Sequence, residues 1–456
     1  MRNSSTLPLS LLIVGIIACS DDGGDTTPTP DVTTDASVDT TAPDAATDGS
    51  STQEDAADTG PEPETPTLEG GYVTLNGMAQ EERACSPFSG HGPYPVGVTT
   101  LEIAGHTVEV WYPAVAAGEF RANYDMRDWL PESEQDKIPD EATPLYTYDA
   151  YRDVMAADGG PFPLVLFSHG LAAYRLQSSI MTAHIASYGY VVAAPDHPER
   201  GLARVVEFLI PEGDFAAATL VEVRDGLAEL NEVDGGLLSG RINMELVAVS
   251  GHSAGGGATY RVLDEAEEGE FDAYMTYASG AFGGAAIPAI PGLVMMGNVD
   301  GVVRPDQTLG TWAVTPQPAV LVNLKETGHL AFSDLCVIGR DRGGILQIAR
   351  ENGIEVNDLL VRLGTDGCDA EVNLAMEVVF PAINGASVAF LEGALRNGDA
   401  TGWQADYASC WADIIETSEL SEYVPSEGSG SEGSGSEGSG NEGSGSEGSG
   451  SEGSGS

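Results

Sequence analysis

VSGHSAG, residues 249–255, is the motif from which the fold is predicted. It has the pattern Gly-x-Ser-x-Gly and directly follows a short apolar run at 246–249. Small residues on both sides of the serine permit a sharp strand-to-helix turn, which lifts the hydroxyl above the edge of a sheet. The composition of 258–268 predicts the helix that must follow. We therefore predict that Ser253 is a catalytic nucleophile.

A serine hydroxyl needs a base to take its proton, and that base is usually a histidine held by a carboxylate. Where the serine lies on a turn of this kind, the chain order is serine, acid, histidine. Of the seven histidines, only His329 follows Ser253, in ETGHL (326–330), just after the apolar run 319–324. Catalytic groups lie at the carboxyl ends of strands in open α/β sheets. His329 is the predicted base.

The acid is expected after the strand that precedes the histidine loop. GNVDG (297–301) follows an apolar run and contains Asp300, which we predict to be the acid. Asp-Gly is also an ordinary turn dipeptide. Asp306 is the alternative acid, although it follows a proline and would more simply cap a helix. Two further aspartates are interpreted as surface carboxylates: Asp264 and Asp272.

An oxyanion hole needs two backbone N–H groups. One comes from the residue after the nucleophile, here Ala254, and the other from the loop after the third strand. That strand is predicted at 162–167 and is followed by SHGL (168–171). Leu171 is therefore the second predicted donor, and its side chain is expected to form part of the acyl pocket wall.

Three aromatic side chains lie close to these motifs in the sequence. Phe282, just past the sixth predicted strand, either supplies an aromatic wall to the acyl site or packs in the core. His169 and His252 flank the predicted catalytic turns. We expect each to form a local hydrogen bond that holds its turn, and not to act in catalysis.

Apolar runs and helical stretches alternate along the chain, which indicates a mainly parallel sheet. The predicted fold class is α/β: an α/β-hydrolase fold, with a mostly parallel twisted sheet and helices on both faces. Residues 98–103 and 108–112 predict an opening antiparallel pair. Residues 372–398 predict a terminal helix broken near Pro381.

Three further regions resemble a known group: FPLVLFSHGLAAYRLQSSIMTAHIASYGYVVAAPDHPERG (162–201), VSGHSAGGGATYRVL (249–263) and KETGHLAFSD (325–334). They are similar to the plasma platelet-activating factor acetylhydrolases and to dienelactone-hydrolase-like bacterial esterases. The resemblance covers roughly residues 85–400. It implies an α/β-hydrolase fold and serine esterase activity, with the nucleophile, base and oxyanion donors at the positions named above.

One position departs from the acetylhydrolase pattern. That family carries its acid directly after the sixth strand, where this chain has the carboxylate-free stretch YASG (277–280). Asp300 lies one strand later, the position usual in α/β-hydrolases and in bacterial cutinases. We expect a serine carboxylic-ester hydrolase, an esterase or lipase that works through an acyl-enzyme. The alternatives are a cutinase-like polyester hydrolase and a catalytically inactive surface binding module, which the complete Ser, Asp, His order argues against.

The two ends of the chain differ in composition from its middle. The first 19 residues resemble a targeting signal, and residues 20–70 and 426–456 contain few aliphatic residues. Residues 16–19, IIAC, look like a bacterial lipobox after a short apolar segment, which implies lipidation of Cys19. Two or three acyl chains suffice for stable anchoring. We therefore expect a lipid-anchored protein of the bacterial cell envelope, at the outer membrane, or else a secreted one. Four segments are predicted: the signal 1–19, a disordered acidic tether 20–70, the catalytic domain 71–425 with insertions at 115–160 and 335–370, and a SEGSG low-complexity tail 426–456.

The remaining four cysteines are even in number and would meet an oxidising environment, where three pairings are open to them. We favour Cys336–Cys368, which closes the insertion after the His329 loop, and Cys85–Cys410, which ties the chain ends. The spacing suggests no metal site, and no cofactor is expected.

The formal net charge of −52 limits the partners. Such a surface repels nucleic acid and anionic lipid. The expected partners are a neutral small-molecule, lipid or polymeric ester, and a membrane reached through the N-terminal lipid. The sequence does not predict an oligomeric state.

Overall fold

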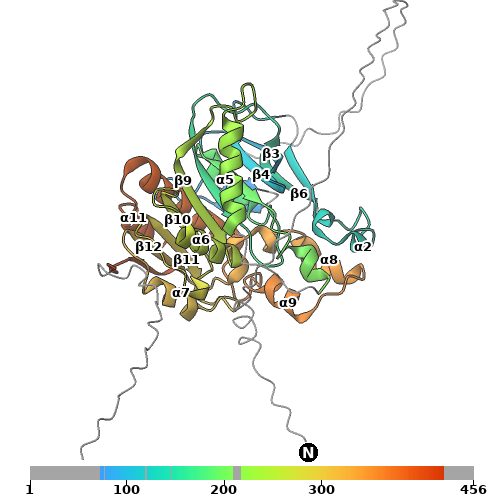
Figure 1. Ribbon diagram of the computed structural model, residues 1–456. Coiled ribbons are helices and arrows are strands. Elements are labelled where there is room, and N and C mark those ends of the chain that lie inside the picture. The colour runs from blue at the N-terminus through green and yellow to red at the C-terminus, as the bar shows by residue number, and fades with distance from the viewer. Residues whose placement is uncertain (1–71, 76–77, 119–120, 144, 209–216, 426–456) are drawn as a thin grey trace, which may run out of the picture.

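The computed structural model describes residues 72–75, 78–118, 121–143, 145–208 and 217–425 (Figure 1). The predicted signal with Cys19, the whole of the predicted tether and the SEGSG tail lie outside the described residues.

The architecture rests on an eleven-stranded sheet and a separate pair, β1 (Tyr72–Leu75) with β2 (Met78–Glu81). In spatial order the large sheet contains β13 (Ile415–Leu420), β12 (Ala319–Leu324), β11 (Gly292–Gly297), β10 (Ala273–Tyr277), β9 (Ile242–His252), β7 (Phe162–Ser168), β8 (Val191–Pro195), β4 (His106–Pro113), β3 (Val96–Ile103), β6 (Leu145–Arg152) and β5 (Arg121–Asp125). The β3–β4 pair is the opening antiparallel pair that the alternating sequence predicts.

The strands from β12 to β8 run parallel, which confirms the predicted fold class. Strand β7 pairs with both β8 and β9, so the chain reverses its strand order here. In open α/β sheets, ligands bind at such a switch point, outside the carboxyl ends of the strands. The sheet is that of an α/β-hydrolase.

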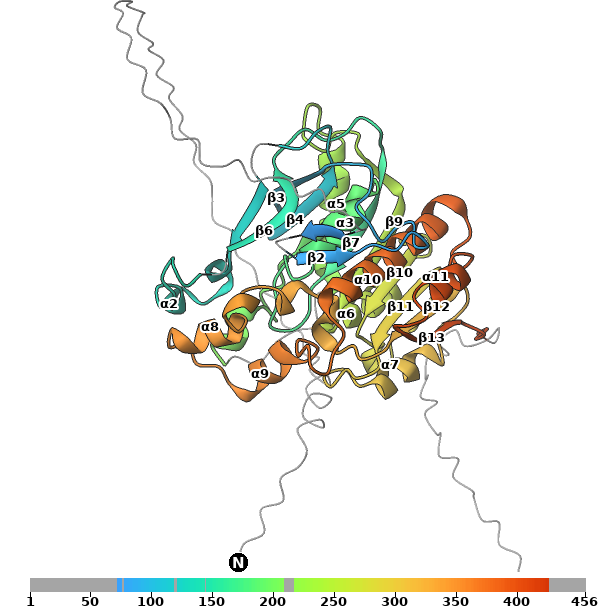
Figure 2. The ribbon, with the colours of Figure 1, turned by 180° about the vertical axis from the view of Figure 1, so that it is seen from behind.

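Alternate residues of each central strand pack into two separate cores. Val165 and Phe167 of β7 belong to one, while Leu164 and Leu166 belong to the other. Helices α3 (Ser179–Ser187) and α10 (Met376–Leu391) cover the first face, and α5 (Ala217–Asn231) and α6 (Ala254–Glu265) cover the second (Figures 1 and 2). Burial on both faces explains why these strands are continuous apolar runs.

Shorter helices occupy the loops. The α-helices are α2 (Glu132–Gln135), α4 (Leu202–Val206), α7 (Pro305–Trp312), α8 (Ile345–Glu351), α9 (Asp358–Thr365) and α11 (Gln404–Cys410). The 3-10 helices are η1 (Met126–Trp129), η2 (Phe282–Gly284), η3 (His329–Phe332), η4 (Asp334–Cys336) and η5 (Arg340–Arg342), and a π-helical turn forms η6 (Glu392–Asn397).

The two predicted insertions lie side by side at one end of the molecule. The first insertion, 115–160, is not wholly separate from the sheet, because β5 and β6 extend its edge and only η1 and α2 project from it. The second insertion, 335–370, forms η5, α8 and α9. Both views place α2 next to α8 and α9 (Figures 1 and 2).

The prediction of a broken terminal helix at 372–398 was wrong. Helix α10 runs through Pro381 without a break, and α11 and β13 follow it. The proline removes one backbone hydrogen bond, but the helix from Val379 onward is buried against the core, which holds it together. Residues Met376–Asn397 are long and apolar enough to cross a membrane by length and composition, yet most of them are buried inside the protein.

Both predicted disulfides are present. Cys85–Cys410 ties the two ends of the described chain, with an S–S distance of 2.03 Å. Cys336–Cys368 closes the second insertion, with an S–S distance of 2.02 Å.

Candidate active site

Ser253 occupies a sharp turn between β9 and α6. Its backbone has φ 56° and ψ −119°, a conformation that residues with a side chain seldom adopt. The flanking glycines are required by close backbone contacts. A Cβ on Gly251 would lie 2.3 Å from the carbonyl oxygen of Gly255, and a Cβ on Gly255 would lie 2.0 Å from that of Ser168. The Gly-x-Ser-x-Gly sequence thus forms the strained elbow for which it is suited.

Asp300 and His329 form a buried pair at the ends of neighbouring strands. His329 Nδ1 lies 2.8 Å from Asp300 Oδ2, and the two residues are 2% and 4% exposed. The other carboxylate oxygen, Oδ1, accepts the N–H groups of Val302 and Val303 at 2.8 Å each. Three donors therefore fix the carboxylate, and a proton on Nδ1 leaves Nε2 of His329 as the basic nitrogen.

Asp306, the alternative acid, lies elsewhere. It is exposed in the first turn of α7 and pairs with Arg304 at 3.0 Å. That hydrogen bond lowers the pKa of Asp306. The expected capping role was wrong, because the cap position of α7 is Arg304.

His252 connects the elbow to the other loops of the site. Its Nδ1 accepts the amide of Gln177 at 2.8 Å, and its Nε2 donates to the carbonyl oxygen of His329 at 3.0 Å. Gln177 also accepts the N–H of Gly170 at 2.7 Å. Burial, and then the neighbouring His329, lower the pKa of His252 well below its ordinary value, so the ring is neutral. The expected local hydrogen bond of His252 was wrong, because its two partners lie 75 and 77 positions away in the chain. Gln177 is a residue of this site that sequence patterns did not indicate.

Asp366, at the C-terminal end of α9, was also missed. Its Oδ1 accepts the N–H of His329 at 2.6 Å, and its Oδ2 accepts the N–H of Gly301 at 3.0 Å. One carboxylate therefore joins the loop of the base to the loop of the acid. Cys368, two residues on, anchors this stretch through its disulfide to Cys336.

The loop after β7 lies directly against the elbow. A Cβ on Gly170 would lie 3.2 Å from the Cβ of Ser253. The amides on both sides of Leu171 are used within the protein, by Gln177 and by the carbonyl oxygen of Arg200. Leu171 thus lies between two bonded amides in a loop beside the elbow, and Ala254 is the first residue of α6. Their roles as oxyanion donors stay predictions.

The same loop is held by a buried hydrogen-bond network. His169 Nδ1 donates to the carbonyl oxygen of Gly170 at 2.8 Å, the local bond that was expected. Its Nε2 accepts the N–H of His197 at 3.0 Å. Burial and the nearby Arg200 lower the pKa of His169 well below its ordinary value. His169 is thus a neutral structural residue.

Phe282 is half-buried in η2 and lies over the first turn of α6. A Cβ on Gly257 would meet its ring at 3.8 Å. It does not line the apolar cavity that lies between the two insertions.

Fold and site together define an α/β-hydrolase fold in which an elbow serine and a hydrogen-bonded histidine–aspartate pair both lie at the carboxyl ends of the parallel strands. A sequence profile of the family described as "Platelet-activating factor acetylhydrolase, isoform II" matches residues 80–209, and one described as "Chlorophyllase" matches residues 151–272. These matches confirm the predicted resemblance to the esterase group of α/β-hydrolases.

Individual relatives are similar over part of the chain. The platelet-activating factor acetylhydrolase of Cavia porcellus is 24% identical over 233 residues, which cover 39% of this chain and 52% of that protein. The chain thus spans about half the length of this curated relative. A solved ferulic acid esterase from Streptomyces cinnamoneus has a TM-score of 0.48 and 21% identity, covering 68% of this chain and 92% of that one.

Proposed function

We propose that this protein is a serine hydrolase of carboxylic esters. The observation that carries the proposal is the buried His329–Asp300 hydrogen bond of 2.8 Å at the same sheet edge as the strained Ser253 turn. The ring of His252, the neighbour of Ser253, lies 4.6 Å from the ring of His329, so base and nucleophile are within the same cluster.

In this mechanism Nε2 of His329 takes the proton of Ser253 as Oγ attacks the ester carbonyl. Asp300 keeps the imidazole in the required tautomer and stabilises the imidazolium. The N–H groups of Leu171 and Ala254 stabilise the oxyanion of the tetrahedral intermediate. His329 then gives the proton to the leaving alcohol, which departs. In the second half of the reaction His329 takes a proton from water as the water attacks the acyl-enzyme, and it returns that proton to Ser253 as the acid is released.

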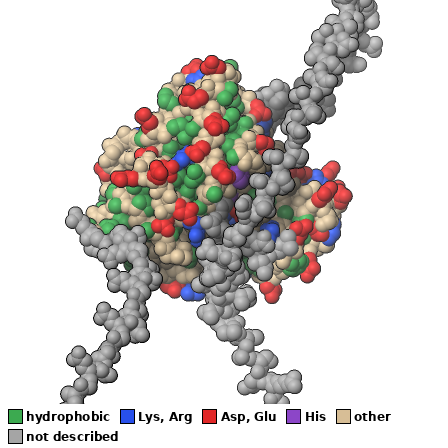
Figure 3. Space-filling model, viewed as in Figure 1, with side chains coloured by type: hydrophobic (Ala, Val, Ile, Leu, Met, Phe, Trp, Pro, Cys, Tyr) green, Lys and Arg blue, Asp and Glu red, His purple; other side chains and the backbone are tan. Residues whose placement is uncertain are grey.

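The surface supports a neutral ester as substrate. Acidic side chains are spread over the face seen in Figure 3, and basic ones are few there. A surface of this sign repels anionic substrates. The acetylhydrolase and chlorophyllase matches support an ester or lipid ester within the same class.

We further propose that the enzyme is attached to a bacterial membrane through lipid on Cys19. The support is the lipobox-like sequence IIAC alone. Replacing the cysteine, Cys19→Ser, should move the protein from the membrane fraction to the soluble fraction. An unchanged distribution, with no acyl mass on the parent protein, would refute the anchor without affecting the proposed activity.

The activity is tested with p-nitrophenyl acetate and the variant Ser253→Ala. Loss of the nucleophile should lower the rate by at least about 10³ while the fold persists. A folded Ser253→Ala protein with near-parent activity would overturn the proposal. A parent protein with no activity on any ester would instead favour the inactive binding module.

A further inference from the structure

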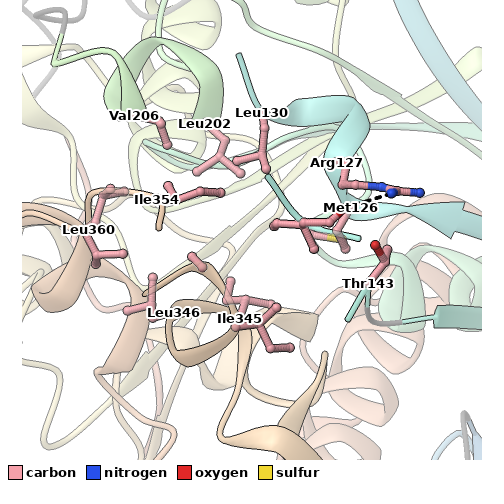
Figure 4. A pocket seen from close by; sticks show the side chains of 14 residues that line it. Met126, Arg127, Leu130, Thr143, Leu202, Val206, Ile345, Leu346, Ile354 and Leu360 are labelled. Atoms are coloured by element: carbon pink, nitrogen blue, oxygen red, sulfur yellow. Dashed lines mark hydrogen bonds between the residues drawn. The ribbon is translucent and has the colours of Figure 1, made fainter. Parts of the chain in front are cut away.

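An apolar cavity of about 70 Å³ lies between the two insertions. Helix α4 forms its base, the first insertion supplies one wall, and the second insertion supplies the other. Figure 4 shows the lining side chains converging on it, among them Met126, Leu130, Leu202, Ile345, Ile354 and Leu360.

The polar residues of the lining direct their polar atoms away from the cavity or bond them locally. The guanidinium group of Arg127 pairs with Asp125 and Asp140 and donates to the carbonyl oxygen of Ile138. The hydroxyl of Thr143 donates to the carbonyl oxygen of Pro139 at 3.2 Å. The wall is therefore hydrocarbon, so a polar or charged ligand would lose its hydration there without gaining partners.

One side of the cavity adjoins the oxyanion loop. Leu171 and its neighbour Ala172 pack on the same apolar cluster as the lining residues Val206 and Leu360. The N–H of Leu202 bonds to the carbonyl oxygen of Ala173 at 3.0 Å. The base of the cavity is thus fixed to the loop that carries the predicted oxyanion donor.

The opposite walls are attached to the site as well. Met126 of the first insertion accepts the hydroxyl of Tyr174 at 3.3 Å, only three residues beyond Leu171. Leu360 lies on α9, and Asp366, the residue directly after this helix, bonds to the backbone of His329. A chain attached to a carbonyl group in the oxyanion hole would therefore find this cavity beside it.

We propose that the cavity receives an unbranched hydrocarbon chain of the ester substrate. This inference rests on the proposed ester hydrolase activity and adds the substrate class. A water-sized group needs about 10–15 Å³ by this measure of volume, so the cavity holds roughly five to seven carbon atoms. Medium-chain esters are the substrates that fill it.

The test is the ratio of kcat/KM on p-nitrophenyl hexanoate to that on the acetate. Each buried methylene contributes about 0.8 kcal/mol, which is a factor of about four, so the parent ratio should exceed about tenfold. Leu346 lines the cavity and is half-buried. The protein should therefore still fold when a larger or a smaller side chain replaces it. Leu346→Trp should lower the ratio about tenfold, and Leu346→Ala should move the optimum toward octanoate and decanoate.

The control is Val233→Trp, an exposed position after α5 that does not line the cavity. This variant should show the same dependence of kcat/KM on chain length as the parent protein. A matched series of alkyl acetates distinguishes the alcohol chain from the acyl chain, since only the chain that occupies the cavity will show the Leu346 effect.

The outcomes separate the two proposals. If the parent hydrolyses acetate and neither Leu346 variant changes the profile in either series, the cavity assignment is overturned and the esterase proposal stands. If the parent hydrolyses no ester of either series, both proposals fail together.

Discussion

At Ser253 the chain holds a backbone conformation that costs on the order of 1–3 kcal/mol. Both backbone polar groups of the residue are satisfied in this conformation. Its N–H bonds to the carbonyl oxygen of Tyr277 at 2.9 Å, and its carbonyl oxygen accepts the hydroxyl of Ser279 at 2.7 Å. These bonds connect the elbow to the loop after β10 and keep the serine side chain at the edge of the sheet.

Asp300 and Asp306 provide a matched pair of substitutions at the residue scale. Asp300→Asn removes the carboxylate that fixes the tautomer of His329, so kcat should fall by up to about 10⁴ while folding survives. Asp306→Asn breaks only an exposed pair with Arg304 and should change kcat little. Steady-state kinetics on both variants, with circular dichroism to check folding, decide the matter. If Asp306→Asn lost its activity and Asp300→Asn kept it, Asp306 would be the acid of the triad and Asp300 would not.

Chain order and strand ends are enough to predict a triad of Ser253, Asp300 and His329. The structure brings Asp300 and His329 into hydrogen-bond contact, while the catalytic roles of the three residues stay predictions. The sequence could not indicate the residues that act through tertiary contacts. Gln177 reaches His252 across 75 positions, and Asp366 reaches His329 across 37. Neither has a local motif, because its role depends on which loops the fold brings together.

Among the secondary-structure elements, the end of α9 is tied to the site: Asp366, directly after the helix, and the Cys336–Cys368 disulfide hold the loops of Asp300 and His329. Asp366→Ala removes both acceptors that join the loops of Asp300 and His329, and we expect kcat to fall about 10- to 100-fold with a smaller change in KM. Asp366→Asn retains one acceptor and should recover part of the loss. Kinetics and a pH profile of kcat/KM measure the effect. A merely structural role would lower the melting temperature and leave both kcat and the profile of the folded enzyme unchanged.

The control for this prediction is Asp358→Ala, an exposed position in the first turn of the same helix. It should have little effect on kcat. Replacing both Cys336 and Cys368 by serine should act in the same direction as Asp366→Ala, because it releases the same stretch of chain.

Elements were predictable where the apolar runs were short and bounded, as for β7, β10, β11 and β12. The first insertion was harder to interpret, because β5 and β6 lie at the sheet edge and lack the continuous apolar pattern of a central strand. The break predicted near Pro381 was wrong for a different reason. Local propensity ends a helix at proline, but the burial of α10 outweighed it.

For the whole molecule, buried neutral histidines connect stability to pH. Burial lowers the pKa of His184 to about 4, from an ordinary value near 6.5. Below pH 6.5 the unfolded chain binds a proton that the folded chain excludes, so stability is lost as the pH falls toward 4. The loss from this one group is about 3 kcal/mol.

His184→Gln should remove that dependence, since an amide can still donate to the carbonyl oxygen of Phe88. Denaturant unfolding of parent and variant at pH 7 and pH 4 measures the difference. The parent should lose more stability between the two values than the variant. Equal losses in the two proteins would contradict a buried, neutral His184.

Covalent labelling decides whether Ser253 is the nucleophile of this molecule. A fluorophosphonate should react once per chain and be found by mass spectrometry on the peptide that contains Ser253. The adduct should be absent from Ser253→Ala and form far more slowly in Asp300→Asn. A parent protein that does not react, or an adduct on another residue that persists in Ser253→Ala, would contradict the account.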